Sequence, residues 1–467
     1  MDEDSTNQTY IKKNLSKIGH KALKSKKNSL SFFEVLGESI ADIAPTATPA
    51  INIPIVFALA GNGSWIDYLI ATILTFMLAN QINEFTKRFP SSGSLYTYAK
   101  YGLGKRLGFS AGAAIIFAYL ATGLASICGF GIYVNNLLGF FNLHINIEIL
   151  IFLGAILAWL IAMSRAKVSA KIMMIVELTS VASIILLGFI TLTKHDFISN
   201  LGNVAFHDLS IPKISSGIGL SFFGFVAFEG AASLGKEAQK PLKNIPRSLK
   251  LGPLIVGGFF IFMALTIIMN FSAFHTNLAN STAPLSFLAT HNHINFLGLL
   301  ITIIVPTSFW SCAVGVITAA SRIFMQMGQE KYLPSIFSYK NIKTHIPIIA
   351  VSLITSLIII LNLLLTITNP ITDVYDWFGT IAVFGFLVAY ILINVSVPKF
   401  LHNIHELKLR NILFTSLTFI ILLFPLVGSI YPQPTGPAKY LPYIFLSFLI
   451  IVNIYYSFRK KLIAVKQ

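Results

Sequence analysis

The segment FFGFVAFEGAASLGKEAQKPLKNIP, residues 222–246, places a single carboxylate, Glu229, among phenylalanine, alanine and glycine residues. The segment is apolar enough around this residue to lie inside a membrane. A carboxylate is costly at that depth, and such residues mark a pathway, a proton site or a bound partner. The segment therefore predicts a membrane protein with a functional site at or near Glu229.

The rest of the chain has the composition of one polytopic membrane domain. Of its 467 residues, 55% are hydrophobic and 11% are charged, and apolar runs near twenty residues recur to the C-terminus. Cys128 and Cys312 both fall inside apolar runs, so we expect neither a disulfide framework nor a metal site. Residues 1–33 form a lysine-rich tail without the pattern of a signal peptide. Its lysines either bind acidic lipid headgroups or stay solvated.

Twelve apolar spans are expected, because a helix of about 20 residues crosses about 30 Å of hydrocarbon. The expected spans are 36–60, 65–84, 107–138, 147–163, 168–192, 215–235, 251–273, 295–323, 346–367, 375–397, 410–430 and 440–458.

The distribution of positive charge predicts the orientation of these spans. Of the 34 lysine and arginine residues, all but Lys194, Lys213 and Lys439 lie in the two tails or in alternate loops on one side. Positive charge is retained on the cytoplasmic side, so both termini are expected to be cytoplasmic. The net charge of +16 then indicates a cytoplasmic rim of cations and not a nucleic-acid surface.

Missing motifs exclude several classes of protein. No G-x-x-x-x-G-K-[ST] sequence occurs, which argues against an ATP-driven pump. The spans contain no convergent cluster of His, Asp, Glu and Cys, so we expect neither an enzyme nor a cofactor. No charged ring or repeated filter sequence indicates a channel. His291 and His293 form an H-x-H pair in an outer loop, which we interpret as solvated.

The first span is expected to break, because it holds Pro45, Pro49 and Pro54 within one apolar run. Each proline lacks an amide donor and displaces the carbonyl four residues earlier. Unpaired carbonyls inside a membrane must face protein, water or a ligand. Two prolines four residues apart, flanked by Thr46 and Thr48, favour a true interruption over a simple kink.

The sixth span is the other candidate for a break, because glycines recur through it at positions 217, 219, 224, 230 and 235. Glycine is a poor helix former and lets a backbone open or approach a ligand closely. The two broken spans hold matching positions if the first ten spans form two repeats of five. Matching breaks in two inverted halves point to a substrate site near the middle of the membrane.

Three segments resemble the amino acid/polyamine/organocation (APC) superfamily of transporters. Residues 222–246 are similar to its F-F-A-F-x-G-F-E … E-x-x-N-P-x-x-x-I-P signature. AASRIFMQMGQEKYLPSIF at 319–337 resembles the segment at the inner end of the family's eighth helix, and FPSSGSLYTYAKYGLG at 89–104 resembles the stretch after its second helix.

This resemblance implies an all-α membrane protein with a LeuT-like five-plus-five inverted repeat. The first repeat would cover about 34–193, the second about 215–397, and two extra helices about 409–458, before a cytoplasmic tail at 459–467. The family moves small organic solutes by alternating access.

The resemblance also implies which residues bind the substrate. Relatives hold the substrate carboxylate with amides at the first break and the amino group with carbonyls at the second. The first set corresponds to Pro45, Thr46, Ala47 and Thr48, where most relatives have G-S-G; this is a departure, because Pro45 cannot donate. On the sixth span, Phe223 matches an aromatic gate, and Gly224, Phe225, Val226 and Ala227 match the unwound part.

The resemblance assigns coupling roles less fully. Glu229 stands where several relatives have a proton-sensing acid, although a structural Glu tying two helices together is the alternative. Glu177 is the other intramembrane acid, with a proton role or a structural one. Ser180 replaces a lysine of some proton-coupled relatives, and Ser311 is a candidate sodium ligand if its hydroxyl does not bond its own helix.

Two further acids, Glu38 and Asp42, lie in the inner half of the first span and are interpreted as snorkelling or interfacial groups. Together the patterns predict a secondary transporter of a neutral or cationic amino acid or a related amine. It would work in the cytoplasmic membrane by symport with H⁺ or Na⁺ or by exchange. The alternative is a receptor that binds such a molecule on the same scaffold without transporting it.

Overall fold

The computed structural model describes residues 29–164, 166–193, 202, 206–207, 209–281, 283–342, 344–431 and 436–465. Most of the expected N-terminal tail and Lys194 therefore lie outside the described residues. The elements are α2 (Phe32–Ile43), η1 (Thr48–Asn52), α3 (Ile53–Ala60), η2 (Gly61–Gly63), α4 (Ser64–Thr86), α5 (Ser94–Leu103), α6 (Lys105–Phe140), α7 (Ile147–Ala162), α8 (Ala166–Thr193), α10 (Ile211–Phe223), η3 (Phe228–Lys236), α11 (Pro241–Ala273), η4 (Leu278–Asn280), α12 (Pro284–His291), α13 (Asn295–Gln329), η5 (Ser335–Ser338), α14 (Ile348–Thr366), α15 (Ile371–Asn403), α16 (Leu409–Gly428), η6 (Gly436–Tyr440) and α17 (Leu441–Val465).

Ten helical segments of the described chain are long and apolar enough to cross a membrane. One of them, Phe32–Thr86, runs for 55 residues through α2, η1, α3, η2 and α4. The apolar helix α7 is shorter, with 16 residues.

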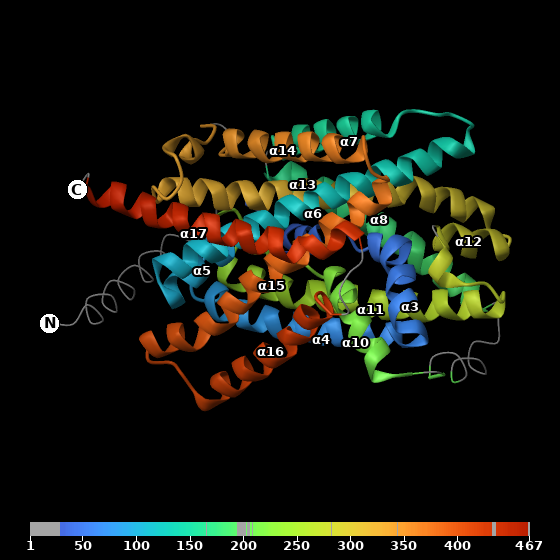
Figure 1. The fold of residues 1–467 in the computed structure, drawn as a ribbon, viewed down its shortest axis with the longest axis horizontal. Coiled ribbons are helices and arrows are strands. Elements are labelled where there is room, and N and C mark those ends of the chain that lie inside the picture. The colour runs from blue at the N-terminus through green and yellow to red at the C-terminus, as the bar shows by residue number, and fades with distance from the viewer. Residues whose placement is uncertain are drawn as a thin grey trace.

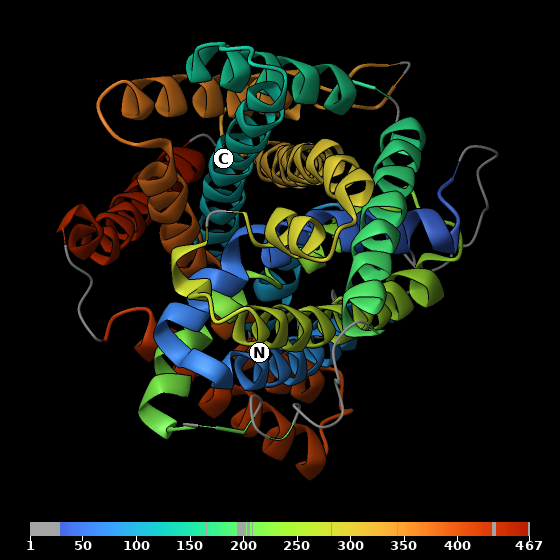
Figure 2. The same ribbon diagram turned by 90° about the vertical axis from the view of Figure 1, so that its right-hand side faces the viewer.

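The helices form an elongated bundle (Figure 1). Helices α6, α13 and α15 run along its length, and α6 packs against the other two. Helices α7 and α14 lie side by side along one edge, with α16 along the opposite edge (Figures 1 and 2). Large apolar side chains on the outer helices are exposed, including Leu417 and Ile420 on α16 and Ile450 and Ile451 on α17. Such a surface suits lipid and not water.

Two segments that were expected to be loops contain helix in the structure. Helix α11 begins at Pro241 and not near residue 251, because proline is tolerated in the first turn of a helix. Helix α5, Ser94–Leu103, occupies a stretch that was expected to be a loop. It is held to the end of α13 by Lys100, whose Nζ lies 2.6 Å from the Glu330 carboxylate. Burial, together with the Glu330 carboxylate, raises the pKa of the Tyr96 hydroxyl, which therefore stays a donor to Glu330.

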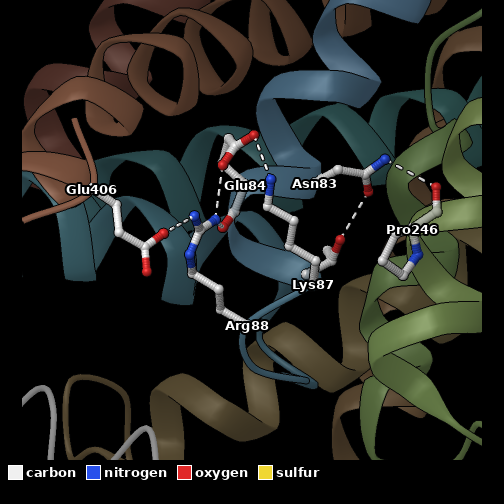
Figure 3. A network of polar contacts seen from close by, with 7 residues as sticks. Asn83, Glu84, Lys87, Arg88, Pro246 and Glu406 are labelled. Carbon is white, nitrogen blue, oxygen red and sulfur yellow. Dashed lines mark hydrogen bonds and ion pairs between the residues drawn. The ribbon is translucent and has the colours of Figure 1, made fainter. Parts of the chain in front are cut away.

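A second polar network lies at the C-terminal end of α4 (Figure 3). Arg88 pairs with Glu84 on α4 at 2.8 Å and with Glu406 in the segment after α15. Asn83 donates to the Pro246 carbonyl of α11 at 2.9 Å. These contacts tie α4 to α11 and to the segment after α15, at the end of the bundle where α5 and the C-terminal end of α17 also lie (Figure 1).

Candidate functional site

The first transmembrane segment is interrupted between Ile43 and Thr48. Helix α2 ends at Ile43, and Ala44 adopts a left-handed conformation with φ 51°. The chain then makes a turn and one π-helical segment, η1, with Pro49 in its first turn. Pro45 and Pro49 are the local cause of the interruption, since neither has a backbone N–H to donate. Side chains satisfy carbonyls on either side of the break: Cys312 Sγ lies 3.1 Å from the Asp42 carbonyl, and the Tyr133 hydroxyl donates to the Ala50 carbonyl at 2.9 Å.

The second interruption lies between Phe223 and Phe228. Helix α10 ends at Phe223, the next four residues form turns, and Ala227 has φ 71° before the 3₁₀ helix η3 begins. The two breaks approach each other closely. A Cβ added at Gly224 would lie 2.9 Å from Thr48 Oγ1, so the two breaks pack tightly at this glycine.

A small cavity of about 30 Å³ lies where the two breaks meet. Its walls come from both interruptions and from helices α6, α13 and α15. The lining residues are Asp42, Ile43, Ala44, Ala47, Thr48, Asn52, Thr122, Ala125, Ser126, Phe223, Gly224, Val226, Phe309, Cys312 and Tyr375. A water molecule needs roughly 10–15 Å³ of such volume, so the cavity has room for about two water molecules and is too small for an amino acid.

Five of the nine expected substrate-binding residues line this cavity: Ala47, Thr48, Phe223, Gly224 and Val226. The other four, Pro45, Thr46, Phe225 and Ala227, are not part of its lining. Phe225 instead packs against Phe260 of α11, with ring centroids 5.0 Å apart.

The sequence analysis did not predict several of the residues that line the cavity. Asn52 accepts a hydrogen bond from the Tyr375 hydroxyl of α15 at 3.3 Å, a contact between residues far apart in the chain. Thr122 and Ser126 of α6 are four residues apart and share one helix face, a pattern that could have indicated them.

Glu229 is not among the residues that line this cavity. Its side chain is fully buried. It accepts hydrogen bonds from the Tyr119 hydroxyl of α6, at 2.8 Å, and from the Tyr390 hydroxyl of α15. The carboxylate thus connects η3 to two of the central helices.

Glu177 of α8 is buried as well and accepts a hydrogen bond from Ser308 of α13 at 2.9 Å. Ser311, one turn further along α13, also lies beside this carboxylate. The Ser180 hydroxyl donates to the Val176 carbonyl of its own helix at 2.7 Å. The structure therefore places Ser311 next to Glu177 and turns the Ser180 hydroxyl toward its own backbone.

The interpretation of Glu38 and Asp42 as interfacial groups is wrong. Glu38 is 3% exposed and Asp42 is 1% exposed, because η3, α8, α11 and α13 cover α2. Asp42 also lines the cavity. Among the described residues, no three His, Cys, Asp or Glu side chains are grouped as metal ligands.

Known proteins are similar to this chain over most of its length. The family described as "Amino acid permease" matches residues 35–463. The chain is 28% identical over 348 residues to the serine/threonine exchanger SteT of Bacillus subtilis (strain 168), covering 71% of this chain and 73% of that one. It is 23% identical over 323 residues to the branched-chain amino acid permease BcaP of Lactococcus lactis subsp. cremoris (strain MG1363), covering 64% and 68%.

A third relative is the low-affinity putrescine importer PlaP of Escherichia coli (strain K12), 26% identical over 346 residues, covering 71% of this chain and 72% of that one. The crystal structure of MhsT in complex with L-phenylalanine has a similar fold. It superposes with a TM-score of 0.58 at 14% identity, covering 85% of this chain and 98% of that chain.

Proposed function

Because the chain belongs to the amino acid permease family, whose relatives named above are transporters of amino acids or an amine, we propose that it is a secondary transporter working by alternating access. Its substrate is a neutral or cationic amino acid or a related amine. One observation carries the proposal: a cavity lies where two interrupted helices meet, with walls that also come from the central helices α6, α13 and α15. Such breaks expose backbone dipoles that bind charged groups of a solute inside a membrane.

The proposed architecture has twelve membrane spans. The 55-residue segment Phe32–Thr86 is too long for one crossing at 1.5 Å per residue, so we count it as two spans separated at η2. Helix α7 supplies a further span, although it is short. Residues 34–193 and 215–397 form the two inverted repeats, and α16 and α17 lie outside them. The end of the bundle with α5 faces the cytoplasm, because most of the positive charge lies there.

The cavity must enlarge to take a substrate. Phe223 of the second break is in its wall and is the proposed gate. Thr48 offers its amide and its hydroxyl to the substrate carboxylate, while Gly224 and Val226 offer carbonyls to the substrate ammonium group. Ala47 lines the cavity beside them, and its amide donates to the Ala44 carbonyl at 2.9 Å. Pro45, Thr46, Phe225 and Ala227 hold the shape of the two breaks. Coupling to H⁺ involves Glu229 and Glu177, and Ser180 and Ser311 remain candidates for an ion site.

Thr48→Val is expected to weaken the apparent affinity for substrate roughly 10-fold or more, because a hydrogen bond to a charged group is worth about 1.5 kcal/mol or more. Thr48 Oγ1 is buried in the cavity wall and has no hydrogen-bond partner among the described residues. The measurement is the concentration dependence of uptake into proteoliposomes.

The matched control is Thr355→Val. Thr355 is buried on α14, outside the cavity, and its hydroxyl donates to the Val351 carbonyl of its own helix at 3.0 Å. The apparent affinity of the Thr355→Val variant for substrate should equal that of the wild type. Equal affinities for Thr48→Val and the wild type would show that the first break binds substrate through its backbone alone or not at all.

Uptake of labelled serine, valine, phenylalanine, lysine and putrescine into proteoliposomes tests the proposed function. Three conditions run in parallel: an inward proton gradient, an inward sodium gradient, and vesicles preloaded with unlabelled solute. Uptake driven by a gradient indicates symport, whereas uptake seen only after preloading indicates exchange. A solute that binds without any flux would instead support the receptor alternative.

A further inference from the structure

Asp42 is a buried carboxylate without a partner. It is 1% exposed, and neither of its carboxylate oxygens has a hydrogen-bond partner within the described chain. The Asp42 backbone carbonyl accepts a hydrogen bond from Cys312 Sγ at 3.1 Å. The side chain also forms part of the wall of the cavity between the two helix breaks.

Two glycines on different elements make room for this carboxylate. A Cβ added at Gly230 of η3 would collide with one Asp42 carboxylate oxygen, and a Cβ added at Gly315 of α13 would collide with the other. The carboxylate therefore sits in a slot between η3 and α13. Helix α11 approaches α2 at Gly252, opposite Ser39.

The ionisable groups around Asp42 do not neutralise it. Glu38 on its own helix, Glu229 on η3 and Glu177 on α8 add negative charge, and Arg322 on α13 adds positive charge. Arg322 is already bound to Glu237, with distances of 3.0 and 3.1 Å. The remaining ionisable neighbours, Tyr119 of α6 and Cys312 of α13, are neutral weak acids.

An unpaired carboxylate in such surroundings is costly, by several kcal/mol. No lysine, arginine or histidine is among the residues that line the cavity. An ionised Asp42 in this cavity therefore requires a positive charge that the lining does not supply.

We propose that Asp42 is a cation-binding residue of this cavity, which closes only when one monovalent positive charge reaches the carboxylate. The charge is the ammonium group of a cationic substrate, or a proton or sodium ion that accompanies a neutral amino acid. This inference rests on the proposed function in taking the cavity as the transport site.

The test compares the apparent melting temperature of the purified full chain in detergent for the wild type, Asp42→Asn and Glu38→Gln. Glu38→Gln is the control, because Glu38 is a buried acid one turn earlier on α2 that does not line the cavity. At pH 8, sodium chloride, methylammonium chloride and putrescine are each added against tetraethylammonium chloride at equal ionic strength. A parallel series lowers the pH to 5.5 without these cations.

At least one of the four cation sources should stabilise the wild type by about 2 °C or more when it is present at ten times its dissociation constant. The same source should stabilise Glu38→Gln equally and should have no such effect on Asp42→Asn. The source that stabilises the wild type but not Asp42→Asn identifies the cation that Asp42 binds. Equal responses of Asp42→Asn and the wild type to all four sources, or no response in either, would overturn the proposal.

Flux measurements separate this inference from the proposed function. If the Asp42-dependent stabilisation occurs but proteoliposomes show no flux, the cation site stands and the transport proposal fails. If flux occurs but Asp42→Asn keeps the wild-type cation response, the transport proposal stands and the cation site fails.

Discussion

Glu229→Gln is expected to flatten the pH dependence of uptake and to lower its rate by roughly 10- to 100-fold, the worth of hydrogen bonds to a charged group. An ionised Glu229 accepts hydrogen bonds from the hydroxyls of both Tyr119 and Tyr390. A protonated Glu229 must donate its own proton, which weakens one of these two hydrogen bonds. Protonation thus changes how η3 is held to α6 and α15. Glutamine has the same shape but no proton to exchange, so the protein should still fold. The measurement is the initial rate of uptake between pH 5 and pH 8.

Tyr390→Phe is the companion variant, because it removes one of the two donors and leaves the carboxylate in place. It should shift the pH dependence without abolishing it. If Glu229→Gln transports at the wild-type rate and with the wild-type pH dependence, Glu229 has no part in coupling and its role is structural.

Arg322→Met is expected to lower the free energy of unfolding by about 2–3 kcal/mol. Breaking a buried ion pair by removing one partner costs about 3–5 kcal/mol, and the lower value reflects a Glu237 side chain that is 34% exposed and can be rehydrated. The variant also removes a cation that acts on both Glu38 and Asp42. Unfolding in a detergent titration measures the loss.

The double variant Arg322→Met, Glu237→Gln should recover part of this loss, because it leaves one fewer unpaired carboxylate. Arg322→Lys keeps the charge but not the bidentate contact with Glu237. Its free energy of unfolding should therefore lie between those of the wild type and Arg322→Met. A stability of Arg322→Met equal to that of the wild type would show that the pair contributes nothing to the fold.

The positions of the helices and of the two breaks were predictable because their causes are local. Prolines at positions 45 and 49 end α2, and glycine at position 224 permits the close contact with Thr48. Helix α5 was missed because a short amphipathic helix has no long apolar run. The start of α11 was missed because its first turns are charged.

The site was only partly predictable, since its remaining residues depend on contacts across the bundle. Thr48 and Phe223 could be placed at the breaks, but which face of the chain meets the cavity could not, so Phe225 was expected there and packs on Phe260 instead. The tyrosine partners of Glu229 lie 110 and 161 residues away in the chain. The burial of Asp42 follows only from the elements that cover α2.

Counterflow in proteoliposomes tests the central claim most directly, because it measures movement through the protein without needing the coupling ion. Vesicles containing the wild type are preloaded with an unlabelled amino acid or amine that binds the purified protein, and labelled solute is added outside. The account predicts transient accumulation of label that is absent from protein-free vesicles. Binding of the solute without any accumulation, at neutral and acidic pH alike, would contradict the account and make the protein a receptor.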